Sequence, residues 1–295
     1  MTPMPYGRCL DGRFTILDPL GAGAMGTVYR AIQHPFGREV AVKVLDPQMA
    51  DENPDLVKRF LREARLAGRI AHPNVMAVLD MGQTEDGIFY LAAELLRGQT
   101  LGAAIGRDGA ISAVRTVRIG VQLCAALAAA HELGIIHRDL KPDNIMILDG
   151  DEDAVRVLDF GVAKSTAALR AGTEITALHF PVGTAAYMAP EAAAGRPSDM
   201  RADLYSLGIV LYQMLAGRLP FDATSRSEML ARQILEPPPP LIGCCPGPLA
   251  NLVMDLLAKD PTQRPQSALR VLDALLELEG PGTITRPWER RASSR

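Results

Sequence analysis

HRDLKPDN, residues 137–144, is the stretch of this sequence that points most directly to a fold. It follows an Ala-rich apolar run, 121–133, and precedes a short apolar segment, 145–148, so the pattern predicts a polar loop between a buried helix and a strand. Rigid elements often present catalytic groups on such loops. Asp139 can accept a proton from a hydroxyl group, and Asn144 offers an amide oxygen to a hard cation such as Mg²⁺.

Lys141 adds a positive charge two residues after Asp139. An ammonium group can neutralise a phosphoryl group during its transfer, and such reactions depend mainly on positioning and charge stabilisation. The loop therefore suits phosphoryl transfer. The alternative is an ordinary polar loop in which Pro142 stops the preceding helix.

Length and composition set the limits for the rest of the chain. With 295 residues, 48% of them hydrophobic, it can bury the core of one large domain or of two lobes. A net charge of -3 favours neither nucleic acid nor an anionic membrane. Residues 1–14 lack signal-peptide features, and polar residues interrupt the apolar run 119–136, which we expect to be a buried helix. Four cysteines without CxxC spacing favour a reduced, cytoplasmic protein.

A glycine-rich segment, LGAGAMGTV at 20–28, follows the first predicted strand. Glycines let a backbone approach a ligand closely, so that amide N–H groups can cover phosphates. The same spacing fits a dinucleotide-binding fold, where a helix should follow. Here residues 27–31 look like a returning strand, which disfavours that alternative.

Lys43 lies in an alternating strand, EVAVKVL at 39–45. It is either an edge residue with its ammonium group in water or a phosphate ligand, and the upstream glycines favour the ligand. The amphipathic helix expected at 55–70 carries Glu63, which on its own is one solvated acid among many helix charges. Further strands are expected at 75–81 and 88–93.

These motifs, together with DFG at 159–161 and APE at 189–191, resemble the eukaryotic-like protein serine/threonine kinase family, most closely its bacterial branch. The resemblance covers about residues 14–278. It implies an α+β, bilobal protein-kinase-like fold, with a small antiparallel β-sheet lobe carrying helix C and a larger, mainly helical lobe. The expected parts are an N-terminal extension 1–12, a kinase domain 13–278 (small lobe 13–94, hinge 94–98, large lobe 99–278) and a disordered tail 279–295.

The resemblance also implies roles for individual residues. Asp139 would position and deprotonate the hydroxyl group, Lys141 and Lys43 would stabilise charge, and Glu63 would pair with Lys43. Asn144 and Asp159 would bind Mg²⁺, with Mn²⁺ as an alternative. The residues expected to contact ATP are Leu20, Gly21, Ala22, Gly23, Gly26, Val28, Ala41, Lys43, Glu94, Leu96 and Met146.

Arg138 precedes Asp139, and in kinases with this arginine a phosphorylated residue of the activation segment neutralises it. By this resemblance we expect phosphorylation of Thr176, with Thr173 as the second site. The family also implies an ion pair between Glu191 and Arg264, and an anchoring role for Asp203 beneath the catalytic loop.

Two other classes of protein share parts of this pattern. A catalytically silent kinase-fold scaffold would usually lack Lys43, Asp139 or Asp159, and all three are present. A small-molecule kinase of the aminoglycoside or choline type would usually lack Lys141 and the APE segment. Protein substrates with Ser or Thr are therefore expected, together with a homodimer for autophosphorylation in trans. We expect no nucleic acid and no membrane span in this chain, which is either a soluble kinase or a shortened one.

Overall fold

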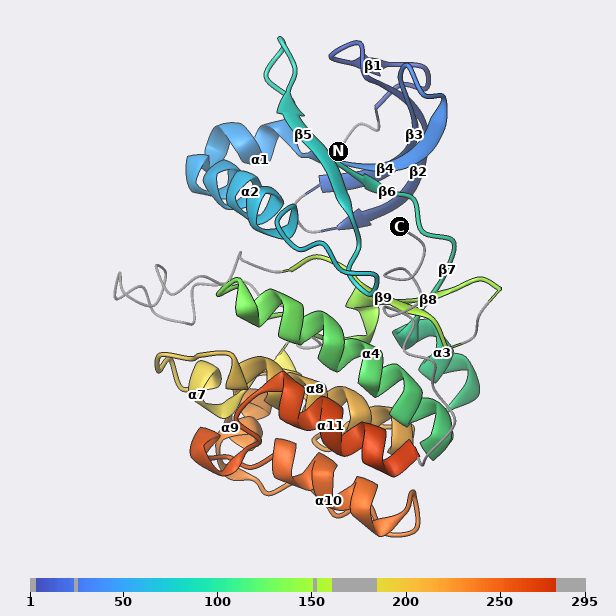
Figure 1. Cartoon of the computed structure of the whole chain (residues 1–295). Coiled ribbons are helices and arrows are strands. Elements are labelled where there is room, and N and C mark those ends of the chain that lie inside the picture. Colours follow the sequence, from blue (N-terminus) through green and yellow to red (C-terminus); the bar gives the residue numbers. More distant parts are fainter. Residues whose placement is uncertain (1–3, 24–25, 151–152, 161–184, 280–295) are drawn as a thin grey trace. The chain divides into compact units, whose positions relative to one another are not determined.

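A computed structural model describes residues 4–23, 26–150, 153–160 and 185–279, without the side chains of Asp51, Arg59, Glu63 and Glu279. The chain forms two compact units (Figure 1). Unit 1 comprises Met1–Ala71 and Met76–Arg97, and unit 2 comprises His72–Val75 and Gly98–Arg295.

Unit 1 is built on an antiparallel sheet of six strands in the order β1-β2-β3-β4-β6-β5. The sequence alternates along β4, so that Val40, Val42 and Val44 are buried while the residues between them are less so. The strands are β1 Cys9–Leu10, β2 Phe14–Gly23, β3 Gly26–Gln33, β4 Arg38–Leu45, β5 Val78–Gln83 and β6 Phe89–Glu94.

Each face of this sheet has its own apolar core. One face is filled by large side chains, among them Phe14, Tyr29 and Tyr90. The other face is covered by α2, Pro54–Ala67, through Phe60 and its neighbours. The short helix α1, Pro47–Glu52, precedes it. Both helices begin with proline after a capping side chain, Asp46 for α1 and Asn53 for α2, which explains where they start.

The strand expected at 75–81 begins only at Val78. Val75 instead forms a parallel bridge with Val157, and Asn74 accepts a hydrogen bond from the Val157 amide at 2.8 Å. Residues His72–Val75 thus belong to unit 2. The apolar segment 75–81 was predicted as one strand, but the boundary between the two units crosses it. The alternation of apolar residues in the sequence does not reveal that boundary.

Unit 2 is mainly helical and contains a small antiparallel sheet, β7-β8-β9. Helix α4 packs on α8 and α11 (Figure 1). The elements are β7 Gly98–Thr100, α3 Leu101–Asp108, α4 Ala113–Glu132, η1 Pro142–Asn144, β8 Ile145–Leu148, β9 Val155–Val157, α7 Pro190–Ala193, α8 Arg201–Ala216, α9 Arg226–Leu235, α10 Gly247–Leu256, η4 Pro261–Gln263 and α11 Ala268–Glu279.

Helix α4 is the buried helix expected from the apolar run 119–136, although it ends at Glu132. Gly134 has a φ of +70°, a conformation that favours glycine and ends the helix. Within the part of the chain that the structure describes, α4 alone is long and apolar enough to cross a membrane, but 72% of its apolar window is buried. That burial is typical of a core helix.

Candidate active site

The backbone of the catalytic loop is held by Asp203 on α8, which is completely buried. Its carboxylate accepts hydrogen bonds from the amides of His137 and Arg138, each at 2.8 Å, and contacts Nε2 of His131 at 2.8 Å. Arg138 has a φ of +63°, which is costly for a residue with a side chain. The carboxylate therefore stabilises a loop conformation that the local sequence would not choose, as expected for the anchor beneath this loop.

The buried ring of His137 forms hydrogen bonds that hold the loop in place. Its Nδ1 accepts from the Asp139 amide at 3.2 Å, and its Nε2 lies 3.0 Å from the Leu158 carbonyl oxygen. Nε2 therefore carries the proton. Burial lowers the pKa of His137, so the neutral tautomer is maintained. Its ring also lies 4.7 Å from the ring of Phe160, measured between centroids.

Three predicted site residues meet at the end of this loop. The Asp139 carboxylate lies 3.2 Å from Nζ of Lys141 and 3.3 Å from Nδ2 of Asn144. Nδ2 of Asn144 also donates to the Asp139 backbone carbonyl at 2.8 Å. The exposed fraction is 23% for the Asp139 side chain and 19% for that of Lys141, so both can reach a reactant.

The two expected metal ligands lie at one end of the β8–β9 pair. Asn144 directly precedes β8 and Asp159 follows β9, and Ile145 is paired with Val157. The Leu158 amide donates to the Asn144 carbonyl at 2.8 Å, which ties the two segments together. One amide and one carboxylate are hard oxygen donors that suit Mg²⁺ when phosphate and water complete its shell. The described residues contain no cluster of three or more His, Cys, Asp or Glu side chains that could hold a metal alone.

Met146, expected beneath the adenine, is half-buried on β8, where it pairs with Thr100 and Arg156. The expected phosphorylation sites Thr173 and Thr176 lie outside the described residues.

The glycine-rich segment forms the hairpin that the sequence predicts, with Gly21 opposite Val28 and Gly23 opposite Gly26. Leu20, Gly21, Ala22 and Gly23 are exposed on β2. Gly26 also meets a packing requirement that the spacing of the glycines in the sequence did not reveal. A Cβ atom there would lie 2.0 Å from the Val44 carbonyl oxygen, so only glycine lets β3 approach β4 this closely.

Strand register places the expected nucleotide residues of unit 1 on one face. Lys43 is opposite Val28 and Leu91, and Ala41 is opposite Ala93. Opposite and alternate residues share a face in an antiparallel sheet. This is also the face against which α2 packs, because Leu91 belongs to that core. Glu63 belongs to α2, but its side chain lies outside the described part.

The hinge residues Glu94 and Leu96 are half-buried at the end of unit 1, whose boundary with unit 2 falls between Arg97 and Gly98. Glu94 exchanges hydrogen bonds with Ala77: its amide donates at 2.9 Å, and its carboxylate accepts at 2.8 Å. The backbone of the predicted hinge is thereby fixed to the start of β5.

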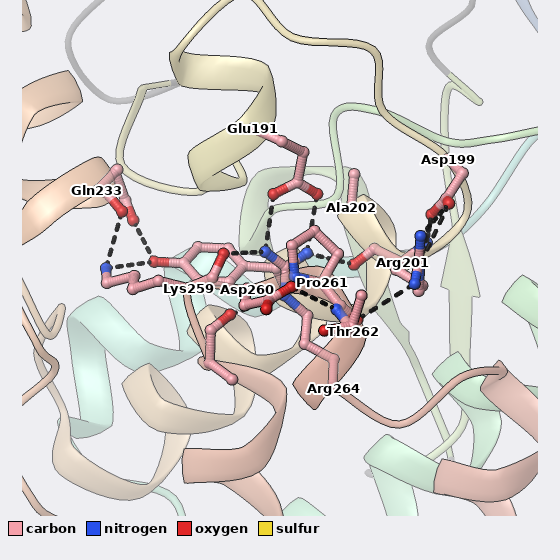
Figure 2. Close-up of polar contacts among 12 residues, drawn as sticks. Glu191, Asp199, Arg201, Ala202, Gln233, Lys259, Asp260, Pro261, Thr262 and Arg264 are labelled. Atoms are coloured by element: carbon pink, nitrogen blue, oxygen red, sulfur yellow. Dashed lines mark hydrogen bonds and ion pairs between the residues drawn. The ribbon is translucent and has the colours of Figure 1, made fainter.

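The expected ion pair between Glu191 and Arg264 is present and buried (Figure 2). The carboxylate accepts from Nη1 at 2.8 Å and from Nη2 at 2.7 Å. The guanidinium group also donates to the carbonyl groups of Ala258, Arg201 and Lys259. All five N–H groups of the Arg264 guanidinium group thus donate hydrogen bonds within unit 2. We therefore interpret the Glu191–Arg264 ion pair as structural.

Lys259, beside this pair, was not predicted. Burial, followed by the nearby Arg264 charge, lowers its pKa from 10.5 to about 8. Between about pH 8 and pH 10.5, Lys259 is largely deprotonated in the folded chain but still protonated in the unfolded chain. Lys259 therefore makes the free energy of unfolding rise with pH over this range. Urea unfolding at pH 7.5 and pH 10 should show a smaller rise for Lys259→Met than for the unsubstituted protein. Equal slopes would contradict this.

An antiparallel sheet unit with one long helix, and a helical unit carrying this loop, together form the α+β protein-kinase-like fold. The sequence profile of the protein kinase domain family matches residues 14–275, and the chain therefore belongs to this family.

The chain is similar to bacterial kinases. It is 40% identical over 270 residues to serine/threonine-protein kinase pkn3 of Myxococcus xanthus, covering 89% of this chain and 49% of that protein. It is 42% identical over 278 residues to Pkn1 of the same organism, covering 92% and 39% respectively. It thus spans less than half the length of either relative. The PknI kinase domain of Mycobacterium tuberculosis has a TM-score of 0.72 at 29% identity, covering 93% of this chain and 99% of that one.

Proposed function

We propose that this chain is an ATP-dependent protein serine/threonine kinase that transfers the γ-phosphoryl group of ATP to protein Ser or Thr hydroxyl groups. The observation that carries the proposal is the Asp139–Lys141–Asn144 cluster, held in place by buried Asp203. Asp139 would orient the acceptor hydroxyl group and take its proton, and Lys141 would stabilise negative charge during transfer.

The remaining proposed site residues would bind either the metal ion or ATP. Asn144 and Asp159 would hold Mg²⁺ or Mn²⁺, which supplies positive charge to the phosphates. Lys43, partnered by Glu63, would contact the phosphates of ATP, and the glycine segment would cover them. Leu20, Val28, Ala41, Glu94, Leu96 and Met146 would surround the nucleoside.

We further propose a kinase domain of 13–278 with its hinge at 94–98, cytoplasmic action on protein substrates, and a homodimer that phosphorylates itself in trans. Activation would follow phosphorylation of Thr176 or Thr173, since a phosphate there can neutralise Arg138.

Phosphosite mapping of the purified chain after incubation with Mg-ATP tests this proposal. We expect phosphate on Thr176 or Thr173. ATP binding without any phosphate incorporation, either on the chain or on an added acceptor protein, would instead support the silent scaffold.

Ala93 leads to a prediction about inhibitors. It lies on the face of Lys43 and Ala41, immediately before the hinge, whereas Ala92 points into the opposite core. A small side chain here should leave room beside the adenine. Bulky pyrazolopyrimidine inhibitors should therefore lose about 10- to 100-fold in potency against Ala93→Met, because the larger side chain fills that space. Their unsubstituted parent compounds serve as controls, and equal potency of the bulky compounds on both proteins would refute the prediction.

A further inference from the structure

Gln233 on α9 is a fully buried polar residue to which the expected site assigns no role. Its side-chain Oε1 accepts a hydrogen bond from the Tyr205 hydroxyl group at 2.6 Å. Its Nε2 donates to the carbonyl oxygen of Ala186. One amide thus joins α9 to α8 and to the segment directly before the APE motif.

Lys259 fixes the direction of that amide (Figure 2). Its Nζ donates to the Tyr205 hydroxyl oxygen at 3.1 Å and to the Gln233 carbonyl oxygen at 2.8 Å. Since an ammonium group can only donate, the Tyr205 hydroxyl group accepts from it and turns its own proton toward Oε1. The NH₂ end of Gln233 must then face Ala186.

The segment that receives this bond is tied to the same helix, α8, as the proposed catalytic loop. Ala185 and Ala186 are buried, and the Tyr187 carbonyl oxygen accepts from Oγ of Ser206 at 2.8 Å. Asp203, three residues before Ser206 on α8, accepts from the amides of His137 and Arg138, so one helix is bonded both to this segment and to the loop that carries Asp139. The backbone at 185–187 is thus fixed from two helices, α8 and α9, and α8 also anchors the loop that carries the proposed general base.

We propose that Gln233 is a positioning residue for the protein substrate: by holding the Ala186 carbonyl group, it sets the backbone against which an acceptor chain binds near Asp139. This inference rests on the proposed kinase function and deepens it. The ATP contacts proposed above do not include residues 185–187. Loss of the bond should therefore weaken acceptor binding and leave ATP binding unchanged, since small displacements of a positioning element are costly.

Gln233→Glu isolates this single bond. A carboxylate still accepts from Tyr205 and lies near Lys259, but it cannot donate to Ala186 and repels the carbonyl oxygen. Gln263→Glu is the matched control, because it adds the same charge at an exposed position of η4. Gln233→Met, uncharged and of similar size, replaces the first variant if that one does not fold by circular dichroism.

The kinetic readout is the KM for myelin basic protein, measured beside the KM for ATP and the rate of ATP hydrolysis without acceptor. We expect the acceptor KM to rise about tenfold in Gln233→Glu, the effect of one lost hydrogen bond, with the two ATP parameters within twofold of the unsubstituted protein. The control should match the unsubstituted protein. An unchanged acceptor KM, or an equal loss in the ATP parameters, would overturn the inference.

Amide hydrogen exchange separates this inference from the proposed function. Exchange over 185–192 should quicken in Gln233→Glu and remain unchanged over β4. Quickened exchange in a protein that phosphorylates nothing would show that Gln233 holds this backbone but would refute the kinase proposal, and with it the role toward a protein substrate. Unchanged exchange would refute the positioning role even in an active kinase.

Discussion

Asp139→Asn should lower the rate of acceptor phosphorylation at least about 1,000-fold, near the upper end of what one general base contributes. Asparagine has nearly the same shape, and it can keep the contact between residue 139 and Asn144. It cannot take a proton from a hydroxyl group at neutral pH. The backbone bonds from Asp203 to the loop are unaffected by this change, so the fold should persist.

The measurement is a steady-state phosphorylation assay, accompanied by thermal unfolding and by ATP binding. Asp149→Asn is the control, since it removes the same charge from the exposed turn after β8. Retention of more than a tenth of the activity in Asp139→Asn, with normal activity in the control, would exclude Asp139 as the general base. Loss of ATP binding would contradict its assignment to the hydroxyl group.

Arg264→Leu should lower the free energy of unfolding by about 3–5 kcal/mol, the usual cost of leaving one member of a buried ion pair without its partner. Glu191 and Arg264 are only 5% and 2% exposed, so water cannot replace the lost contacts. The substitution also removes the donors to three backbone carbonyl groups. A loss of this size is a large fraction of the free energy of unfolding of a typical domain. Poor expression of soluble protein is therefore expected as well.

A double-mutant cycle with Glu191→Leu tests whether the pair acts as a unit. The double variant should be more stable than Arg264→Leu alone, because no uncompensated carboxylate remains. Arg232→Leu provides a surface comparison: its pair with Glu228 joins neighbouring turns of α9, and the two side chains are 35% and 38% exposed, so a much smaller change is expected. Additive effects of the two buried substitutions would contradict the coupling.

Several features of the fold were predictable from local sequence because they depend on neighbouring residues. The glycine spacing and the strand alternation at 39–45 predict a hairpin followed by a half-buried strand, and both are observed. Proline and capping side chains define the starts of α1 and α2. The site motif was equally local, since Asp139, Lys141 and Asn144 lie within six residues of one another and meet in the structure.

Local sequence patterns and motifs were therefore enough to predict the fold class and to single out the loop 137–144 as the candidate site. The three-dimensional structure was needed to show which alanine before the hinge shares a face with Lys43, and that Val75 belongs to unit 2. It also shows that the loop anchored by Asp203 contains a left-handed Arg138, which the resemblance did not imply, and that Gln233 reaches Ala186 over 47 positions. The physical reason is that register, close approach and buried hydrogen bonds arise between residues distant in the chain, and local periodicity carries no record of such pairings.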